Sequence, residues 1–348
     1  MDQRIGPGDD RRPDADVTLE RIQEAAAFLV GRVGRTPMLS STTAARVVRV
    51  SAGVALADGR LYAKAEHLQR TGSFKPRGAT FRIARLSAAE RAAGVIAVSA
   101  GNHAAAVAVA AGQLGVLAVV VMPSTAVLTK VEACRGYGAE VILEGVDTAE
   151  AWAAMERIRD ERGLTFIHPF DHPDTIAGQG TMGLEIVEDL PEVDVVVAGV
   201  GGGGMPCGVA VAVKGLRPGA RVYGVEPRGS NALTLGIAAG VPVSIRPVSV
   251  ADGLNAPFAS AATIALGRRL LDDIVLLDDS EILAGLHFAA ERMKQVLEPA
   301  GAAALAAVLH GRVPIRDGER VCVIFSGGNV DVGRLGDLIA AAGPLPEA

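Results

Sequence analysis

The stretch Thr71-Gly72-Ser73-Phe74-Lys75-Pro76-Arg77-Gly78-Ala79 follows a run, residues 61–67, in which apolar and polar side chains alternate. Alternation of this kind predicts a β-strand. The quoted residues would then start in the loop that follows this strand. Glycine lets a backbone approach a ligand closely, and Pro76 fixes the chain just after Lys75. A lysine amine is a useful nucleophile only when its position is fixed and its pKa is lowered. Lys75 could therefore be a positioned nucleophile or an ordinary surface lysine, and the motifs in the rest of the chain distinguish these two interpretations.

The composition bounds the class of protein. The chain has 348 residues, of which 49% are hydrophobic, enough for one large domain or two moderate ones. A net charge of −5 argues against nucleic acid as a partner. No apolar run reaches the length of a membrane span, so no membrane partner is expected. Residues 1–16 are charged and rich in proline and glycine, which predicts a disordered tail and not a signal peptide. The cysteines are few and widely spaced, which suggests reduced thiols in a cytoplasmic protein: Cys134, Cys207 and Cys322.

Beyond Gly94 the chain alternates short β-rich runs with alanine-rich helical stretches. This alternation predicts an α/β architecture with mostly parallel open sheets and helices on both faces. No proline- or serine-rich linker marks a boundary, so a second domain would be inserted within the first. The expected strands are Val95–Ser99, Leu117–Met122, Glu140–Leu143, Thr165–His168, Asp194–Val200, Val222–Val225, Ile274–Leu277 and Val321–Phe325. The expected helices include one beginning at Thr18, Ala79–Leu86, one opened by a capping box at Ser87–Glu90, His103–Leu114 and Thr148–Glu161.

Residues 95–104 combine a strand, a tight turn of small residues and a helix start. Backbone amides at a helix N-terminus point outward and suit a carboxylate. The alternative is an ordinary strand–helix turn in which Asn102 caps the helix.

Residues 194–205 place an apolar strand before four glycines, Gly201 to Gly204, and then a helix. Bare backbone N–H groups and the helix dipole make such a loop a phosphate cradle. The same residues contain Gly199-x-Gly201-x-x-Gly204, and Glu226 follows where a ribose-binding acid would stand, so an NAD-dependent oxidoreductase is an alternative. Against it, the fingerprint lies in mid-chain and leaves the lysine and asparagine loops without a role.

One group of residues in this part of the chain could suggest a metal. His168, Asp171 and His172 have spacing that requires a helix, but Pro169 and Pro173 argue against one, so we interpret them as structural.

Taken together, these segments resemble the pyridoxal 5′-phosphate (PLP) enzymes of the tryptophan-synthase-β type, and most closely the serine/threonine dehydratases. The resemblance runs from about Thr18 to Gly336 and includes a final motif, Ser326-Gly327-Gly328-Asn329, after an apolar strand. It implies the two-domain fold type II. A small α/β domain at residues 94–167 would be inserted into a large PLP-binding domain formed by residues 17–93 and 168–348.

The resemblance also implies the role of each motif. Lys75 would form the Schiff base with the cofactor and be the catalytic residue, with Phe74 beside it. Asn102 would bond the cofactor's phenolic oxygen, and Ser326 its ring nitrogen. The remaining implied residues are Gly201, Gly202, Gly203, Gly204 and Met205 for the phosphate, and Ser99, Ala100, Gly101, Asn102, His103 and Asp252 for the substrate. One departure is Ala105, where family members commonly have glutamine. For Asp252, a turn-forming Asp-Gly pair is an equally good interpretation.

The implied reaction is dehydration and deamination of a small β-hydroxy amino acid, L-threonine and/or L-serine, to 2-oxobutanoate or pyruvate and ammonia. A neutral Ser326 hydroxyl at the ring nitrogen suits β-elimination. A serine racemase, a hydroxyaspartate dehydratase or a catalytically idle binder would share the same motifs. Eukaryotic serine racemases have a serine where this chain has Ala100, so we expect elimination. We expect no metal site, because Ala232 stands where metal-dependent members have an acid to join Glu226. The chain ends soon after Asn329, so no C-terminal regulatory domain is expected, and the family implies a homodimer or homotetramer.

Overall fold

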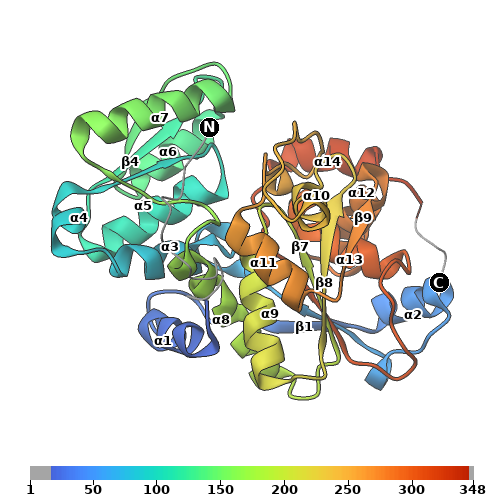
Figure 1. Ribbon diagram of the computed structural model, residues 1–348. Coiled ribbons are helices and arrows are strands. Elements are labelled where there is room, and N and C mark those ends of the chain that lie inside the picture. The colour runs from blue at the N-terminus through green and yellow to red at the C-terminus, as the bar shows by residue number, and fades with distance from the viewer. Residues whose placement is uncertain (1–16, 345–348) are drawn as a thin grey trace.

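Two β-sheets organise residues 17–344, which are the residues that this computed structural model describes (Figure 1). The predicted disordered tail at residues 1–16 lies outside them. The strands are β1 (Met38–Ser41), β2 (Leu61–Lys64), β3 (Val95–Val98), β4 (Ala118–Met122), β5 (Glu140–Leu143), β6 (Thr165–Phe166), β7 (Val195–Gly199), β8 (Arg221–Pro227), β9 (Asp273–Leu277) and β10 (Val321–Ile324). The helices are α1 (Leu19–Leu29), α2 (Thr42–Ala52), α3 (Lys75–Ala84), α4 (Ala88–Ala93), α5 (Asn102–Leu114), α6 (Leu128–Gly136), α7 (Thr148–Arg162), α8 (Pro173–Asp189), α9 (Gly204–Leu216), α10 (Ala232–Ala239), α11 (Ala261–Leu270), α12 (Asp279–Arg292), α13 (Pro299–Leu309) and α14 (Val332–Ala340).

The larger sheet has the strand order β1-β2-β10-β7-β8-β9 and the smaller one β5-β4-β3-β6. Among these pairs, β1 and β2 are antiparallel and every other pair is parallel. The predicted α/β architecture with mostly parallel sheets is therefore confirmed. Within residues 17–344, no helix combines the length and the apolar character needed to cross a membrane.

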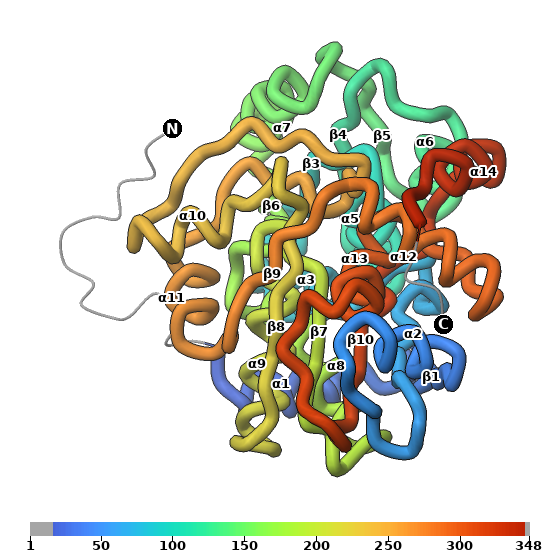
Figure 2. Tube along the Cα trace, turned by 90° about the vertical axis from the view of Figure 1, so that its right-hand side faces the viewer, coloured from blue at the N-terminus to red at the C-terminus, as the bar shows by residue number. Residues whose placement is uncertain are grey.

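The central strands of the larger sheet are buried on both faces, which explains their unbroken apolar sequence. Val195 and Val197 of β7 face a core formed with α12 and α13, whereas Val196 and Ala198 face a core formed with α8 and α9. Figure 1 shows α8 and α9 on one side of β7 and β8 and α12 and α13 on the other, and Figure 2 looks onto the side of α12 and α13. Parallel strands end at one edge of a sheet, so the loops after β7 and β10 emerge side by side.

The smaller sheet is covered in the same way. Alternate residues of β3 and β4 pack against α5 and α6 on one face and against α7 on the other. The first of these cores also includes Ala79 and Ile83 of α3 and Leu86. Residues that precede position 94 therefore take part in packing around the smaller sheet. The division of the chain into domains at 94 and 167 stays a prediction.

Two expected elements have different bounds in the structure. The strand expected at residues 61–67 ends at Lys64, because Glu66 turns inward in a short 3₁₀ segment and pairs with the buried Arg77. The helix expected to begin at Ala79 begins at Lys75, because proline is tolerated in the first turn of a helix, where its missing N–H has no partner anyway. The strand β1 was not expected from the sequence, since it is short and half polar.

Candidate active site

The lysine loop is tied along its length to the segment that follows β10. Ser73 pairs with Gly327 in an isolated β-bridge, and the Phe74 N–H donates to the Ser326 carbonyl at 3.1 Å. Thr71 has a φ of 64°, a left-handed conformation that is uncommon for a residue other than glycine. Lys75 is thus the first residue of α3 and stands on a constrained loop, as a positioned nucleophile requires.

The amine of Lys75 lies in a poorly solvated place. Its Nζ donates to the Pro169 carbonyl at 3.2 Å and lies 5.1 Å from the centre of the Phe74 ring. Burial lowers the pKa of Lys75 to about 8, and the negative charge of Glu298 opposes this shift. The neutral, nucleophilic amine is therefore far more abundant near neutral pH than it is for an exposed lysine.

The four-glycine loop lies close to the same place. It follows the end of β7 and leads into α9, and its Gly203 has a φ of 91°. A Cβ on Gly202 would lie 2.4 Å from the Phe170 ring, and one on Gly204 would lie 2.9 Å from the Phe170 carbonyl. Side chains are therefore excluded at Gly202 and Gly204. Since Phe170 is adjacent to Pro169, the carbonyl partner of Lys75, one segment joins the lysine to the glycines.

Asn102, the first residue of α5, meets a buried acid, Glu298, to which the sequence analysis assigned no role. The Asn102 Nδ2 donates to Glu298 Oε1 at 2.7 Å. Burial raises the pKa of Glu298 to about 7, and the hydrogen bond from Asn102 and the charge of Lys75 oppose the shift. Glu298 opens α13 in a Glu-Pro-Ala-Gly segment, which was the available signal in the sequence. A carboxyl group that can change its charge near neutral pH thus contacts Asn102 and lies in the field of Lys75.

Ser326 lies at the end of β10 and is buried. Its Oγ donates to the Ala300 carbonyl at 3.3 Å, and its own carbonyl accepts from Phe74. A Cβ on Gly301 would lie 2.1 Å from the Gly327 carbonyl, so α13 approaches this turn as closely as backbones allow. The Ser326 hydroxyl is therefore held between the lysine loop and α13.

The residues implied for the substrate form a turn between β3 and α5. The Gly101 N–H donates to Ser99 Oγ at 3.1 Å, and the His103 Nε2 donates to the Ile167 carbonyl at 2.7 Å. Burial lowers the pKa of His103 to about 3, so its ring stays neutral. The positive end of the α5 dipole favours an anion such as a carboxylate at this turn. The neutral His103 adds no charge of its own there.

Asp252 lies at the rim of this region. Its side chain is about half exposed and forms a 3.7 Å ion pair with Arg334, and its charge contributes to the raised pKa of Glu298. A Cβ on the adjacent Gly253 would lie 3.7 Å from Glu298 Oε1. The loop of Asp252 therefore borders the site, and its carboxylate faces the rim.

Glu226 lies apart from this cluster. Its two carboxylate oxygens accept from the backbone N–H groups of Leu233 and Thr234 and from the Thr234 hydroxyl, at 2.6 to 3.1 Å. A glutamate that caps α10 in this way is poorly placed to bind a ribose or a metal ion. In residues 17–344, no group of three or more histidine, cysteine, aspartate or glutamate side chains is arranged to hold a metal.

The histidines before α8 also have local partners. The His168 Nδ1 accepts from the Asp171 N–H at 2.8 Å, and the His172 Nδ1 accepts from the Asp174 N–H at 3.1 Å. Burial lowers the pKa values of both rings, to about 3 and about 4. These contacts support the structural interpretation of this segment.

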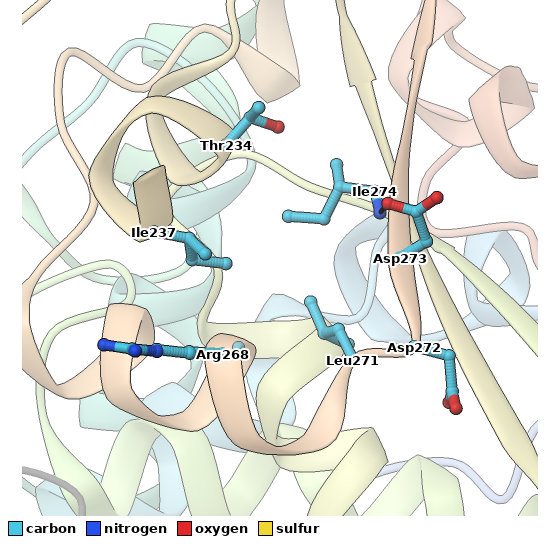
Figure 3. A pocket seen from close by; sticks show the side chains of 8 residues that line it. Thr234, Ile237, Arg268, Leu271, Asp272, Asp273 and Ile274 are labelled. Carbon is cyan, nitrogen blue, oxygen red and sulfur yellow. Dashed lines mark hydrogen bonds between the residues drawn. The ribbon is translucent and has the colours of Figure 1, made fainter. Parts of the chain in front are cut away.

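A separate hollow of about 220 Å³ lies between α10, α11 and the start of β9 (Figure 3). Ile237, Leu271 and Ile274 line it, and none of the residues implied for the cofactor or the substrate does. The two features of the molecule are therefore distinct.

The residues around Lys75 fit PLP. A glycine loop at a helix N-terminus suits the phosphate, and an amine of lowered pKa suits the aldehyde. The Ser73 Oγ, two residues before the lysine, is buried and has no hydrogen-bond partner among the described residues. Buried hydroxyls normally find a partner, so this one is available to a bound molecule or water.

Comparison with known proteins agrees with this fit. The model of the pyridoxal-phosphate dependent enzyme family matches residues 30–327, and the chain belongs to that family. The chain is 42% identical to an L-threonine ammonia-lyase of Thermotoga maritima over 93% of its length and 78% of the relative's.

Solved structures give the same picture. Maize serine racemase superimposes with a TM-score of 0.85 at 35% identity, over 93% of this chain and 97% of that one. The processed form of threonine deaminase isoform 2 from Solanum lycopersicum superimposes with a TM-score of 0.85 at 33% identity, over 94% of each chain. The implied fold type II is therefore confirmed, and PLP is the cofactor of the family.

Proposed function

We propose that this protein is a PLP-dependent ammonia-lyase that converts L-threonine and/or L-serine to 2-oxobutanoate or pyruvate and ammonia. The observation that carries the proposal is the convergence on one half-buried lysine of the glycine loop, the Asn102 turn and the Ser326 turn. The similarity to threonine ammonia-lyase and threonine deaminase supports this reaction over others on the same fold.

Each of these segments has one role in the proposal. The amides of Gly201 to Gly204 and Met205 hold the cofactor's phosphate, and Asn102 donates to its phenolic oxygen. Ser326 faces the ring nitrogen with a neutral hydroxyl, and Phe74 packs beside the lysine. When bound, PLP withdraws the electron pair that remains on the α-carbon after its proton leaves. Ser99 and the backbone amides of residues 100–103 hold the substrate carboxylate, and Asp252 borders the site.

Lys75 moves the protons. A pKa of about 8 leaves an appreciable share of its amine neutral near neutral pH, so it can take the proton from the α-carbon. The resulting ammonium can return a proton to the β-hydroxyl as it leaves as water. After release, the product takes up water and loses ammonia to give the 2-oxo acid.

Racemisation needs a second acid or base on the face of the substrate opposite the lysine. Ala100 stands where eukaryotic serine racemases have a serine and has no proton to give. The hydroxyl of the neighbouring Ser99 accepts from Gly101, within its own turn. With Lys75 as the proton carrier on one face, elimination is favoured over formation of the D-amino acid.

The test is incubation of the purified protein and PLP with a panel of L-threonine, L-serine and L-threo-3-hydroxyaspartate. We expect 2-oxo acid and ammonia in equal amounts from threonine or serine, and chiral chromatography should find negligible D-serine. The variant A100S should gain a small racemase activity. D-serine formed by the wild type as fast as pyruvate would overturn the assignment in favour of a racemase.

The assembly and location follow as part of the proposal. We infer a homodimer or homotetramer acting in the cytoplasm. The three cysteines are buried and free, and burial raises the pKa values of their thiols to about 11 or 12, which suits a reducing compartment.

A further inference from the structure

One side chain that the sequence left without a role, Asn329, connects two loops of the site. Its Nδ2 donates to the Thr71 carbonyl at 2.6 Å and to Asn102 Oδ1 at 2.8 Å. Asn102 in turn donates through Nδ2 to Glu298 Oε1 at 2.7 Å. The lysine loop, the turn after β10, the start of α5 and the start of α13 are therefore joined by one chain of hydrogen bonds.

The direction of this chain is fixed at the Thr71 end. A backbone carbonyl can only accept a hydrogen bond, so Asn329 must present its nitrogen to Thr71. The same nitrogen faces Asn102, which must therefore present its oxygen. The Asn102 nitrogen is left on the opposite side, toward Glu298. An asparagine amide can in general be turned by 180°. Here the Thr71 carbonyl fixes the orientation of Asn329, and Asn329 fixes that of Asn102.

Glycines give this chain the space that it needs. A Cβ on Gly72 would lie 2.2 Å from Asn329 Oδ1, and a Cβ on Gly327 would lie 2.2 Å from Glu298 Oε1. The Thr71 carbonyl that anchors the chain belongs to a residue with a φ of 64°, so the loop is bent to reach Asn329. These glycines allow the two asparagines and the glutamate to touch.

We propose that Asn329 is a positioning residue, which turns the Asn102 amide so that its N–H, and not its carbonyl, serves the phenolic oxygen of PLP. The inference rests on the proposed function, because it concerns the role of Asn102 toward the cofactor. Asn329 itself touches neither the substrate nor the cofactor in this account and acts through Asn102.

The variant N329D tests the proposal, because a carboxylate of the same shape can accept but cannot donate. Asn102 should then turn to donate to the new carboxylate, and its oxygen should face the phenolic oxygen. We expect the dissociation constant of PLP, measured by fluorescence on the apoprotein, to rise about tenfold, the order of one lost charged hydrogen bond. The absorbance of the lysine-bound cofactor should shift toward the shorter-wavelength band of the protonated phenol. N329A, which removes the donor without adding charge, should shift both readouts in the same direction by less.

A double-variant cycle separates positioning from a general structural effect. In an N102A background, N329D should change neither the PLP dissociation constant nor the absorbance further, because the group through which it acts is gone. The control is D331N, since Asp331 lies in the same turn but its carboxylate caps α14. D331N should keep the wild-type absorbance and PLP affinity with little change in melting temperature, because asparagine caps a helix about as well as aspartate does.

Three results would overturn the proposal: wild-type absorbance and PLP affinity in N329D, equal effects of N329D with and without Asn102, or a D331N spectrum shifted as far as that of N329D. None of these results would contradict the proposed function. That function would be contradicted by a different result, a wild type that takes up PLP but releases no 2-oxo acid. A wild type that takes up no PLP would overturn both.

Discussion

Glu298 and Glu226 are both buried, and burial raises the pKa of each to about 7, yet their surroundings differ. Glu226 accepts hydrogen bonds from two backbone N–H groups and one hydroxyl, all supplied by the start of α10. Glu298 accepts from the Asn102 side chain, which comes from α5, and lies in the field of Lys75. A raised pKa therefore reports burial in both regions, and it coincides with the candidate active site in only one of them.

What distinguishes the two regions is the origin of the partners. The partners of Glu226 lie seven and eight residues further along the chain, so its carboxylate stabilises a local turn. The partner of Glu298 lies 196 residues away, and Lys75, Asp252 and Gly327 approach it from three other segments. Changes at the two glutamates should therefore separate activity from stability.

The largest effect is expected for K75A, which removes the amine whose pKa is raised by the charge of Glu298. The variant should lose the absorbance of the lysine-bound cofactor and essentially all turnover, since the nucleophile is lost together with the proton carrier, which alone is worth about 10²–10⁴ in rate. Absorbance spectra and 2-oxo acid release measure both losses. The matched control is K214A, because Lys214 pairs with Asp272 at 2.8 Å away from the site and such pairs contribute about 1 kcal/mol or less. Normal turnover in K75A would show that Lys75 is not the catalytic residue.

E298Q should have the next largest effect, on activity and not on folding. Glutamine can still accept from Asn102, but it removes the negative charge that raises the pKa of Lys75. The pKa of Lys75 should fall further, and the limb of the pH–rate profile that reports it should move to lower pH. Because the change brings the pKa of Lys75 nearer to neutral pH but also makes its amine a weaker base, we expect the optimum of kcat/KM to move to lower pH and its value at neutral pH to change by about two- to tenfold. A profile unchanged in position and height would place Glu298 outside the catalytic machinery.

Strands and loops that depend on neighbouring residues could be predicted from the sequence, whereas contacts between residues far apart in the chain could not. Apolar runs and turn residues placed eight strands within a residue or two, because a buried parallel strand is recognisable from its own composition. Lys75, Asn102 and the four glycines stand in contiguous motifs, so their loops could be located without a structure. The bond from Asn329 to Asn102 spans 227 residues and that from Arg77 to Glu185 spans 108. Neither leaves a signal in any window of the sequence.

E226Q should reverse the pattern of E298Q, lowering stability while leaving kcat/KM within about twofold of the wild type. Glutamine offers one acceptor oxygen where the α10 N–H groups and Thr234 use two, and its NH₂ would face donors. Leaving such buried donors unpaired costs about 1–3 kcal/mol, or several degrees in melting temperature for a chain of this size. Thermal unfolding with parallel assays measures both quantities.

The pH dependence of stability sharpens the same comparison. The folded-state pKa of Glu226 is raised from the ordinary 4.5 to about 7, so the folded protein binds the proton more tightly than the unfolded chain does. Its contribution to stability is therefore fully present below about pH 4.5 and is lost as the pH rises through 7. E226Q cannot titrate, so its melting temperature should fall less steeply than that of the wild type between these pH values. Equal slopes would mean that Glu226 is ionised throughout.

The smallest effect is expected from removing divalent metal. Both oxygens of Glu226 are already engaged by α10, and Ala232 brings no carboxylate to join them, whereas magnesium and calcium prefer several oxygen ligands. Treatment with a chelator should therefore change kcat/KM by less than about twofold, and magnesium or calcium should not raise the melting temperature, because an ion that does not bind the folded state cannot stabilise it. The same treatment of E226Q serves as the control, since any metal effect that depends on this region should vanish there. A different outcome would show that Glu226 binds a metal ion that activity requires. In that case the chelator would cause a large loss of activity in the wild type, magnesium or calcium would reverse it, and E226Q would show no such loss.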